Sequence, residues 1–302
     1  MGQLVDGTWH GGDLPTSARG AFVRAPTTFR GRELVPEAGR YHLYASYACP
    51  WAHRVLITRA LRGLTGAIGL TIVDPHMGEQ GWPLRADDPD PIGGASYLYE
   101  VYLRADPRYT GRATVPVLWD RVAGTIVNNE SRELMRLLDR DLAPLAREPV
   151  VDTLFPDLLV PRIEETLDAI YQPINNGVYR AGLATDQAVH EAAVREVFAA
   201  LARWDEVLGR QRYTCGDTLT AADVALFTTL LRFDPVYHFH FKCNLRRLRD
   251  HANLWRFTRE LWTHPAIAPT CHLDHIKAHY YWSHTQLNPT RIIPLGPILD
   301  EA

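Results

Sequence analysis

The sequence has few cysteines, and none of its apolar runs reaches the roughly 20 residues that a membrane-spanning helix needs. Its four cysteines, Cys49, Cys215, Cys243 and Cys271, are too few and too far apart for a disulfide framework. The N-terminal residues also lack the basic start and the apolar core of a signal peptide. We therefore expect a cytoplasmic protein with reduced thiols and no membrane partner.

Charge of one sign is not in excess either. The formal net charge is −3 over 302 residues, with acidic and basic residues interspersed, and this excludes the basic footprint of a nucleic-acid-binding protein. Hydrophobic residues make up 46% of the chain, which is enough to build a sizeable core. The length suggests about two domains.

The first half alternates between strand and helix patterns. Residues 1–38, rich in glycine, proline, threonine and arginine, are expected to form an extended arm. The elements predicted after it are a strand at 41–45, a helix at 50–61, a strand at 70–73, a helical piece at 97–103, strands at 115–119 and 125–127, and a helix at 132–138. The connection over 76–112 is long, and such connections are usually functional or disordered. This order predicts an α/β domain over residues 39–145.

The second half has helical patterns only. A linker is marked by Pro144, Pro149, Pro156 and Pro161, and helical spacing then recurs at 158–171, 186–209, 220–232 and 253–263. We therefore predict an all-helical domain over residues 146–302, with an extended strap at 284–302. The fold class is α/β plus all-α.

The most informative residue is Cys49, which follows a predicted strand and precedes a helix that begins at Pro50. Proline suits this position, because the first amides of a helix have no partner within the helix. These free N–H groups and the positive end of the helix dipole favour a thiolate and lower the pKa of a cysteine. The fourth residue of the motif is Ala52, so an external thiol must resolve any mixed disulfide formed at Cys49. A small buried core cysteine is the alternative.

Two further elements could complete a binding site. The proline of Val115-Pro116 cannot donate to a sheet, and a cis bond there would free the Val115 backbone to pair with an extended peptide; an ordinary edge strand is the alternative. Glu130 and Ser131 lie at a predicted helix start, where free amides and a hydroxyl can hold a carboxylate and Glu130 an ammonium group; a simple helix cap is the alternative. Together with Cys49, these elements would hold a γ-glutamyl tripeptide with its sulfur against the thiol.

Other groups of residues could carry chemistry in the second half. Two have spacings like those of zinc ligands: His238, His240 and Cys243, and His272, His275 and His279. Their aromatic and basic neighbours favour structural packing, so we predict no metal. Three tyrosines, Tyr179, Tyr237 and Tyr280, could line an aromatic pocket or be amphipathic packing residues.

These motifs resemble those of the Xi-class glutathione transferases, which are the glutathionyl-hydroquinone reductases. The similarity rests on residues 47–54, 114–120 and 126–131 in the first half, and on residues 175–179, 233–237, 241–244, 274–281, 288–290 and 294–297 in the second. It covers nearly the whole chain. Residues 83–94 depart from the family pattern, because they are richer in aspartate and proline and poorer in aromatic residues.

The resemblance implies a thioredoxin-like domain followed by an all-helical domain, a homodimer formed through the helical domains, and glutathione as co-substrate. It implies that Cys49 attacks the sulfur of a glutathionyl-hydroquinone and that a second glutathione resolves the mixed disulfide. The positions that match the family's glutathione-binding residues are Val115, Pro116, Glu130 and Ser131, with Trp82 as a wall over the peptide. The positions that match its quinol-side tyrosines and proton donors are Tyr179, Tyr237 and Tyr280.

Two other functions stay open on the sequence. A general thiol transferase or dehydroascorbate reductase of the omega type shares the one-cysteine site. A non-catalytic glutathione-fold module for protein assembly would not need a cysteine at a helix start.

Overall fold

The computed structural model describes residues 2–12, 17, 19–31 and 33–299, and the chain divides into two compact units. The first, called here the thioredoxin-like unit, comprises Met1–Leu14, Ala25–Asp152 and Asp274–Ile292; the second, the helical unit, comprises Pro15–Arg24, Thr153–Leu273 and Ile293–Ala302. The units are discontinuous in sequence, whereas the expected ranges 1–38, 39–145 and 146–302 are continuous. The difference arises because Pro15–Arg24 group with the helical unit, while most of the helix α9 (Leu273–Ser283) groups with the first unit.

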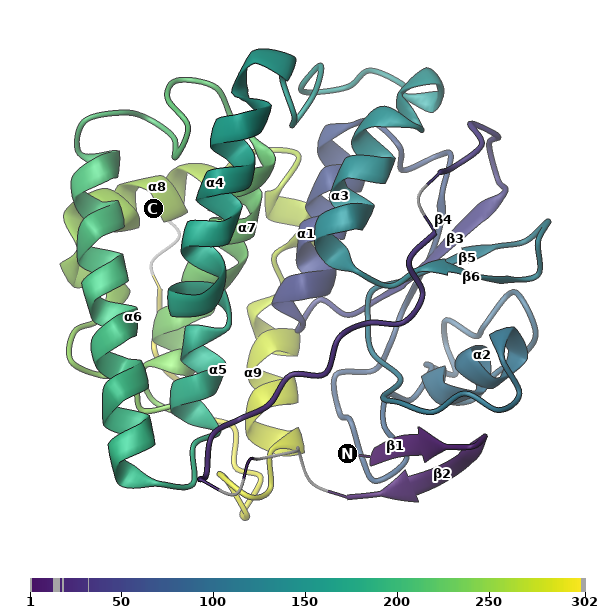
Figure 1. Ribbon diagram of the computed structural model, residues 1–302, viewed down its shortest axis with the longest axis horizontal. Helices are drawn as coiled ribbons and strands as arrows, with labels where there is room; N and C mark the ends of the chain where they lie inside the picture. Colours follow the sequence, from purple (N-terminus) through teal and green to yellow (C-terminus); the bar gives the residue numbers. More distant parts are fainter. Residues whose placement is uncertain (1, 13–16, 18, 32, 300–302) are drawn as a thin grey trace. The chain divides into compact units, whose positions relative to one another are not determined.

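A four-stranded sheet forms the centre of the thioredoxin-like unit, with the strand order β4-β3-β5-β6 (Figure 1). The strands are β3 (Tyr41–Ala45), β4 (Gly69–Ile72), β5 (Val117–Asp120) and β6 (Thr125–Asn128). β3 is parallel to β4 and therefore needs a crossover, which α1 (Pro50–Leu61) supplies. α1 packs against α3 (Ser131–Arg140). All seven elements predicted for this domain are present, including α2 (Leu98–Ala105), and the α/β prediction is confirmed.

A β-hairpin lies where the extended arm was expected. β1 (Gly2–Val5) pairs with β2 (Thr8–Gly11) across Asp6 and Gly7, which have φ values of 46° and 78°. An Asp-Gly pair in this left-handed region is the favoured two-residue turn of a hairpin. The backbone of Leu4 exchanges two hydrogen bonds with Gly111, at 2.8 and 2.9 Å. The expected arm thus contains a hairpin that was not predicted, and the Asp-Gly turn was the missed signal.

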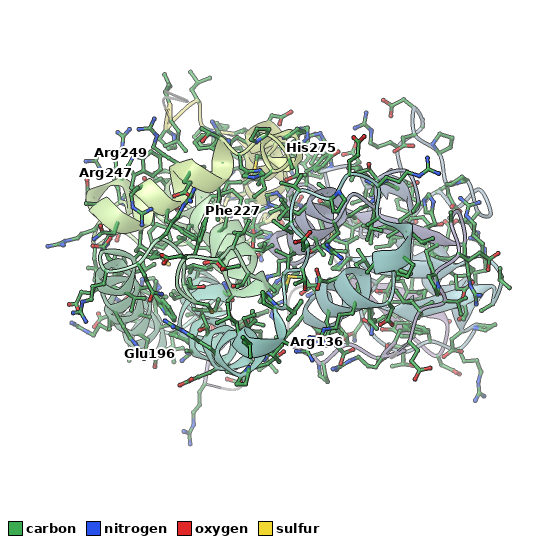
Figure 2. All side chains as sticks on the ribbon, turned by 90° about the horizontal axis from the view of Figure 1, so that it is seen from above. Arg136, Glu196, Phe227, Arg247, Arg249 and His275 are labelled. Carbon is green, nitrogen blue, oxygen red and sulfur yellow. The ribbon has the colours of Figure 1, made fainter. Side chains whose placement is uncertain are left out.

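The described part of the helical unit contains five complete α-helices. They are α4 (Val160–Ile170), α5 (Gly177–Gly182), α6 (Gln187–Leu208), α7 (Ala221–Leu230) and α8 (Ala252–Trp262). Every residue of α7 is buried, as expected of a helix that is mostly apolar on all sides. Figure 2 labels one of these residues, Phe227. A capping box between Thr220 and Asp223 fixes its start. The all-helical prediction for the second half is confirmed, and none of the described helices meets the length and hydropathy of a membrane span.

Two π-helical turns widen the helices of this unit. They span Tyr171–Asn175 and Phe233–Tyr237, and each carries a proline in third place, Pro173 and Pro235. Proline has no N–H to continue the helical ladder, and a locally wider turn accommodates that loss. The first turn leads into α5, which carries Tyr179, and the second ends at a tyrosine.

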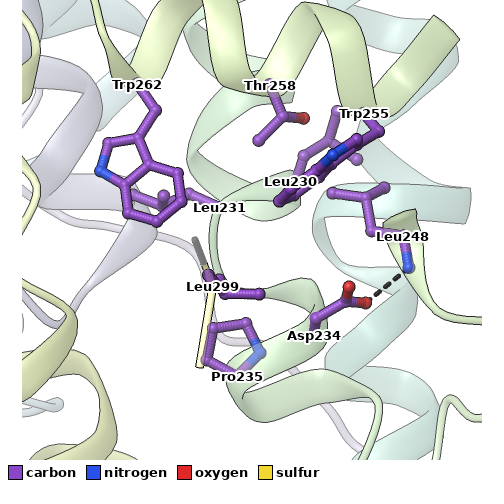
Figure 3. A pocket seen from close by; sticks show the side chains of 9 residues that line it. All are labelled: Leu230, Leu231, Asp234, Pro235, Leu248, Trp255, Thr258, Trp262 and Leu299. Atoms are coloured by element: carbon purple, nitrogen blue, oxygen red, sulfur yellow. Dashed lines mark hydrogen bonds between the residues drawn. The ribbon is translucent and has the colours of Figure 1, made fainter. Parts of the chain in front are cut away.

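The described end of the chain, residues 293–299, belongs to the helical unit. Residues 284–299, which cover the described part of the predicted strap, contain no helix or strand. Leu299 lies in a pocket that Leu230, Pro235 and Trp262 help to line (Figure 3). None of the residues lining this pocket belongs to the predicted site.

Candidate active site

The topology of the sheet brings three of the predicted site elements to one edge of the sheet, the edge at which strands β3 and β6 end and β5 begins. β3 leads into α1 through Cys49, and β6 leads into α3 at Ser131. β3 and β6 are each antiparallel to β5, so they run in the same direction and both helices begin at the same edge. β5 runs the opposite way and therefore starts at this edge, directly after Val115-Pro116. In the register of the sheet, Val117 lies opposite Tyr44, one residue before the end of β3.

Cys49 is the N-terminal cap of α1. Its backbone is extended, with φ −81° and ψ 121°, and its carbonyl accepts the first helical hydrogen bond from the His53 amide at 2.9 Å. Its side chain is half-buried, and its Sγ lies 3.7 Å from the Val115 carbonyl oxygen. The thiol thus combines partial access with the start of a helix, as the sequence predicted.

The Val115-Pro116 peptide bond is cis, and β5 lies in the interior of the sheet, so the edge-strand alternative is wrong. Among the residues that the structure describes, no backbone group pairs with the Val115 amide. This amide can therefore take an extended peptide as a partner.

The start of α3 carries an unsatisfied hydroxyl. Ser131 is the first residue of α3 and is 2% exposed, and no described residue forms a hydrogen bond with its Oγ. A buried hydroxyl without a partner costs about 1–3 kcal/mol, which a ligand acceptor would relieve. Glu130, the cap, accepts from the Arg132 amide at 3.3 Å and from the Thr27 hydroxyl at 3.2 Å. Glu130 therefore caps α3, as the alternative expects, while the Ser131 hydroxyl remains able to donate to an acceptor.

Trp82 lies in the segment that follows β4. Its side chain is 7% exposed and stacks on the His279 ring of α9, with the ring centroids 4.5 Å apart. Its carbonyl accepts from the Leu98 amide at the start of α2. The side chain is therefore held between structured elements of the same unit.

The three predicted tyrosines fall into different units. In the helical unit, Tyr179 and Tyr237 lie together, with ring centroids 6.0 Å apart, and the Phe241 ring lies 5.4 Å from each. The Arg24 guanidinium sits 4.9 Å above the Tyr179 ring. Tyr280 belongs to α9 and the thioredoxin-like unit, where it is 1% exposed.

The remaining cysteines and histidines have structural surroundings. Burial raises the pKa of Cys243 and of Cys271 to about 12. Burial, reinforced by the neighbouring charge of Lys242, lowers the pKa of His240 to about 4. Within the described ranges, no group of three or more His, Cys, Asp or Glu side chains is placed to hold a metal ion.

One residue that organises the long connection escaped the sequence reasoning. The Asp90 carboxylate accepts hydrogen bonds from the Tyr44 hydroxyl at 2.5 Å and from the amides of Ile92, Gly93 and Ala95 at 2.9–3.1 Å. The alternation of Asp and Pro before two glycines is typical of such turns and was the available signal. The connection over 76–112 is thus an ordered segment built around a buried carboxylate.

Comparison with known proteins gives a consistent result. The model of the glutathione S-transferase N-terminal domain matches residues 48–141, and that of the C-terminal domain matches residues 187–260. The chain is 48% identical to the glutathionyl-hydroquinone reductase PcpF of Sphingobium chlorophenolicum, over 98% of this chain and 96% of that protein. It is 45% identical to the glutathionyl-hydroquinone reductase YqjG of Escherichia coli K12, over 99% and 96%.

Solved structures agree with these relatives. The Xi-class transferase of Natrialba magadii superposes with a TM-score of 0.92 at 49% identity, covering 100% of this chain and 94% of that one. The glutathione-bound structure of YqjG superposes with a TM-score of 0.89 at 45% identity, covering 99% and 97%.

Proposed function

Since the chain belongs to the glutathione transferase family, and within it to the Xi class of glutathionyl-hydroquinone reductases, we propose that it reduces glutathionyl-hydroquinones to hydroquinones with glutathione as the reductant. The observation that carries the proposal is the half-buried Cys49 at the start of α1, on the sheet edge that also holds Val115 and Ser131.

The reaction proceeds through a mixed disulfide. The Cys49 thiolate attacks the sulfur of the glutathionyl-hydroquinone, so that a sulfur–sulfur bond forms and the bond between sulfur and the ring carbon breaks. The ring carbon takes the electron pair and a proton, which releases the hydroquinone. A second glutathione thiolate then attacks the mixed disulfide, releases oxidised glutathione and restores the Cys49 thiolate. The free amides and the positive end of α1 favour the Cys49 thiolate, both when it attacks the substrate and when it is released at the end of the cycle.

Glutathione binds along the same edge in this proposal. The Val115 backbone pairs with the extended peptide, after the turn that Pro116 makes, and Trp82 forms a wall over it. Glu130 holds the γ-glutamyl ammonium group, and Ser131 donates its hydroxyl to the carboxylate. The support is the unpaired Val115 amide and the buried Ser131 hydroxyl, each without a partner in the described part of the chain. One further support is that glutathione is bound in the structure of the relative YqjG.

The quinol side is assigned to Tyr179, Tyr237 and Tyr280. Their phenols hydrogen-bond the quinol oxygens and supply the proton that the departing ring carbon takes. The support is that Tyr179, which lies beside the buried Tyr237, is itself only partly buried and can face a flat ring.

We further propose a homodimer formed through the helical units, as the Xi-class resemblance implies. We place the protein in the cytoplasm, because the reaction consumes reduced glutathione and needs Cys49 as a reduced thiol, and none of the four cysteines forms a disulfide. Light scattering of the purified protein tests the dimer.

The test of the proposed function is Cys49→Ser. This variant should lose turnover of glutathionyl-menadiol by roughly a thousandfold or more, because the nucleophile is gone, while it still binds glutathione. Cys271→Ser is the matched control and should keep full activity. Full turnover by Cys49→Ser would refute the assignment. A rate on dehydroascorbate above that on a panel of glutathionyl-quinols would favour the omega-type alternative.

A further inference from the structure

The last helix of the chain holds the segment that carries Trp82. α9 presents His275, His279, Trp282 and Ser283 at spacings of i, i+4, i+7 and i+8, which place them on one stripe of a helix. Figure 2 marks His275 on this helix. Both histidines belong to the group whose spacing resembles that of zinc ligands. In the structure, their rings instead contact aromatic side chains of the same unit.

His279 makes two contacts with the segment after β4. Its ring stacks on the Trp82 indole, with centroids 4.5 Å apart and planes inclined by 23°. Its Nδ1 lies 3.0 Å from the Pro75 carbonyl oxygen. A carbonyl only accepts, so Nδ1 carries the proton and donates it. With 7% of its surface exposed, this ring is fixed on both its face and its edge.

Other residues of the same stripe hold the start of this segment. The Ser283 hydroxyl donates to the Pro75 carbonyl at 3.4 Å and accepts from the Met77 amide at 3.1 Å. The Trp282 ring meets the His76 ring edge-on, with centroids 5.1 Å apart. The backbone that leads to the indole is thus fastened to α9 at several points.

The stripe also reaches the segment before the nucleophile. The His275 ring meets the Tyr47 ring edge-on, with centroids 5.5 Å apart, and Tyr47 stands two residues before Cys49. One face of α9 therefore contacts both the chain that enters α1 and the chain that carries Trp82.

We propose that His279 is a positioning residue for glutathione recognition, which acts by holding the Trp82 indole in its binding orientation. The proposal rests on the proposed function, in which Trp82 covers the peptide. An indole that is already fixed loses little side-chain freedom when the ligand arrives, so less of the binding free energy is spent on ordering it. Since His279 acts through Trp82, its loss weakens glutathione binding and leaves the chemical step at Cys49 unchanged.

The experiment compares variants of one helix in the full-length protein. His279→Phe keeps an aromatic ring but removes the donor to Pro75, whereas His279→Gln keeps a donor but removes the ring. Asp274→Asn, an exposed polar change on α9, is the matched control. Calorimetry gives the Kd of glutathione, and turnover of glutathionyl-menadiol gives kcat and KM. Fluorine NMR of protein labelled with 5-fluorotryptophan reports the indole, with the Trp82 signal assigned from Trp82→Phe.

Both His279 variants should shift or broaden the Trp82 signal, raise the Kd of glutathione about 5- to 30-fold and change kcat less than about twofold. Asp274→Asn should match the wild type in all three measurements. If the His279 variants fold poorly, Ser283→Ala removes a single hydrogen bond to the same segment and should raise the Kd by about 2- to 5-fold.

Two results would overturn this inference but leave the proposed function in place. One is a wild-type Kd in a His279 or Ser283 variant whose Trp82 signal has moved. The other is a Trp82→Ala variant that binds glutathione normally and also turns over glutathionyl-menadiol, because neither binding nor the reaction would then need the Trp82 side chain. Failure of the wild-type protein to bind glutathione or to turn over any glutathionyl-quinol would instead overturn the proposed function, and the inference with it.

Discussion

The buried carboxylate of Asp90 is expected to hold the long connection in place. Its Oδ1 accepts from the Tyr44 hydroxyl and the Ile92 amide, and its Oδ2 accepts from the amides of Gly93 and Ala95. Burial acts to raise the pKa of Asp90, but these hydrogen bonds outweigh it and the net pKa is lowered. The folded state therefore favours the ionised carboxylate, and its contribution to stability is present above pH 4 and is lost as the pH falls below that value.

Asp90→Asn isolates this effect because the two side chains have the same shape. The amide NH₂ must replace one of the two oxygens, so at least one donor is left facing another donor. In the better orientation the oxygen stays toward Gly93 and Ala95, the Tyr44 hydroxyl rotates to accept, and the Ile92 amide loses its partner. The Arg104 guanidinium, 3.3 Å from Oδ2, also loses its ion pair. One orphaned amide and weakened charge-assisted bonds together cost about 2–4 kcal/mol.

Urea denaturation of the two proteins at pH 7 measures the loss in the free energy of unfolding. Asp87→Asn is the matched control, because Asp87 lies in the same segment but is exposed and pairs only with Arg85 among the contacts described for it. An exposed pair of this kind is worth about 0–1 kcal/mol. A loss below about 1 kcal/mol for Asp90→Asn, or an equal loss for both variants, would refute the reasoning.

Three further outcomes are expected. Burial, with the charge of Arg121, lowers the pKa of His42 to about 4. As the pH falls below about 6.5, His42 therefore becomes protonated in the unfolded chain but not in the folded chain, and the free energy of unfolding should drop by up to about 3 kcal/mol by pH 4. His42→Gln should reduce this pH dependence, as measured by urea denaturation at a series of pH values. Asp223→Ala removes the carboxylate of the α7 capping box and should lower the unfolding free energy by about 3 kcal/mol, which thermal and chemical denaturation would check. Iodoacetamide at pH 8 should modify Cys49 well before Cys243, and peptide mass spectrometry would expose the opposite order.

Much of the fold follows from local sequence signals. The apolar run at 41–45 and the proline at the first helical position give β3 and α1 with the bounds that were predicted, because both signals act over a few residues. The hairpin at the N-terminus was also within reach, since Asp6-Gly7 is a strong turn signal. The long connection was harder, because the role of Asp90 depends on Tyr44, which lies 46 residues earlier in the chain.

The sequence by itself determined which groups the site can use: a lone thiol at a helix start, a proline before a strand, and a carboxylate and a hydroxyl at a second helix start. These are local properties, set by backbone dihedral preferences and by the free amides of a helix end. Only the tertiary structure decided that these groups share an edge, because the directions of β3, β5 and β6 depend on hydrogen bonds between distant segments. The same holds for α9: its histidines read as metal ligands or as packing along the sequence, and only the return of this helix to the thioredoxin-like unit sets His279 against Trp82.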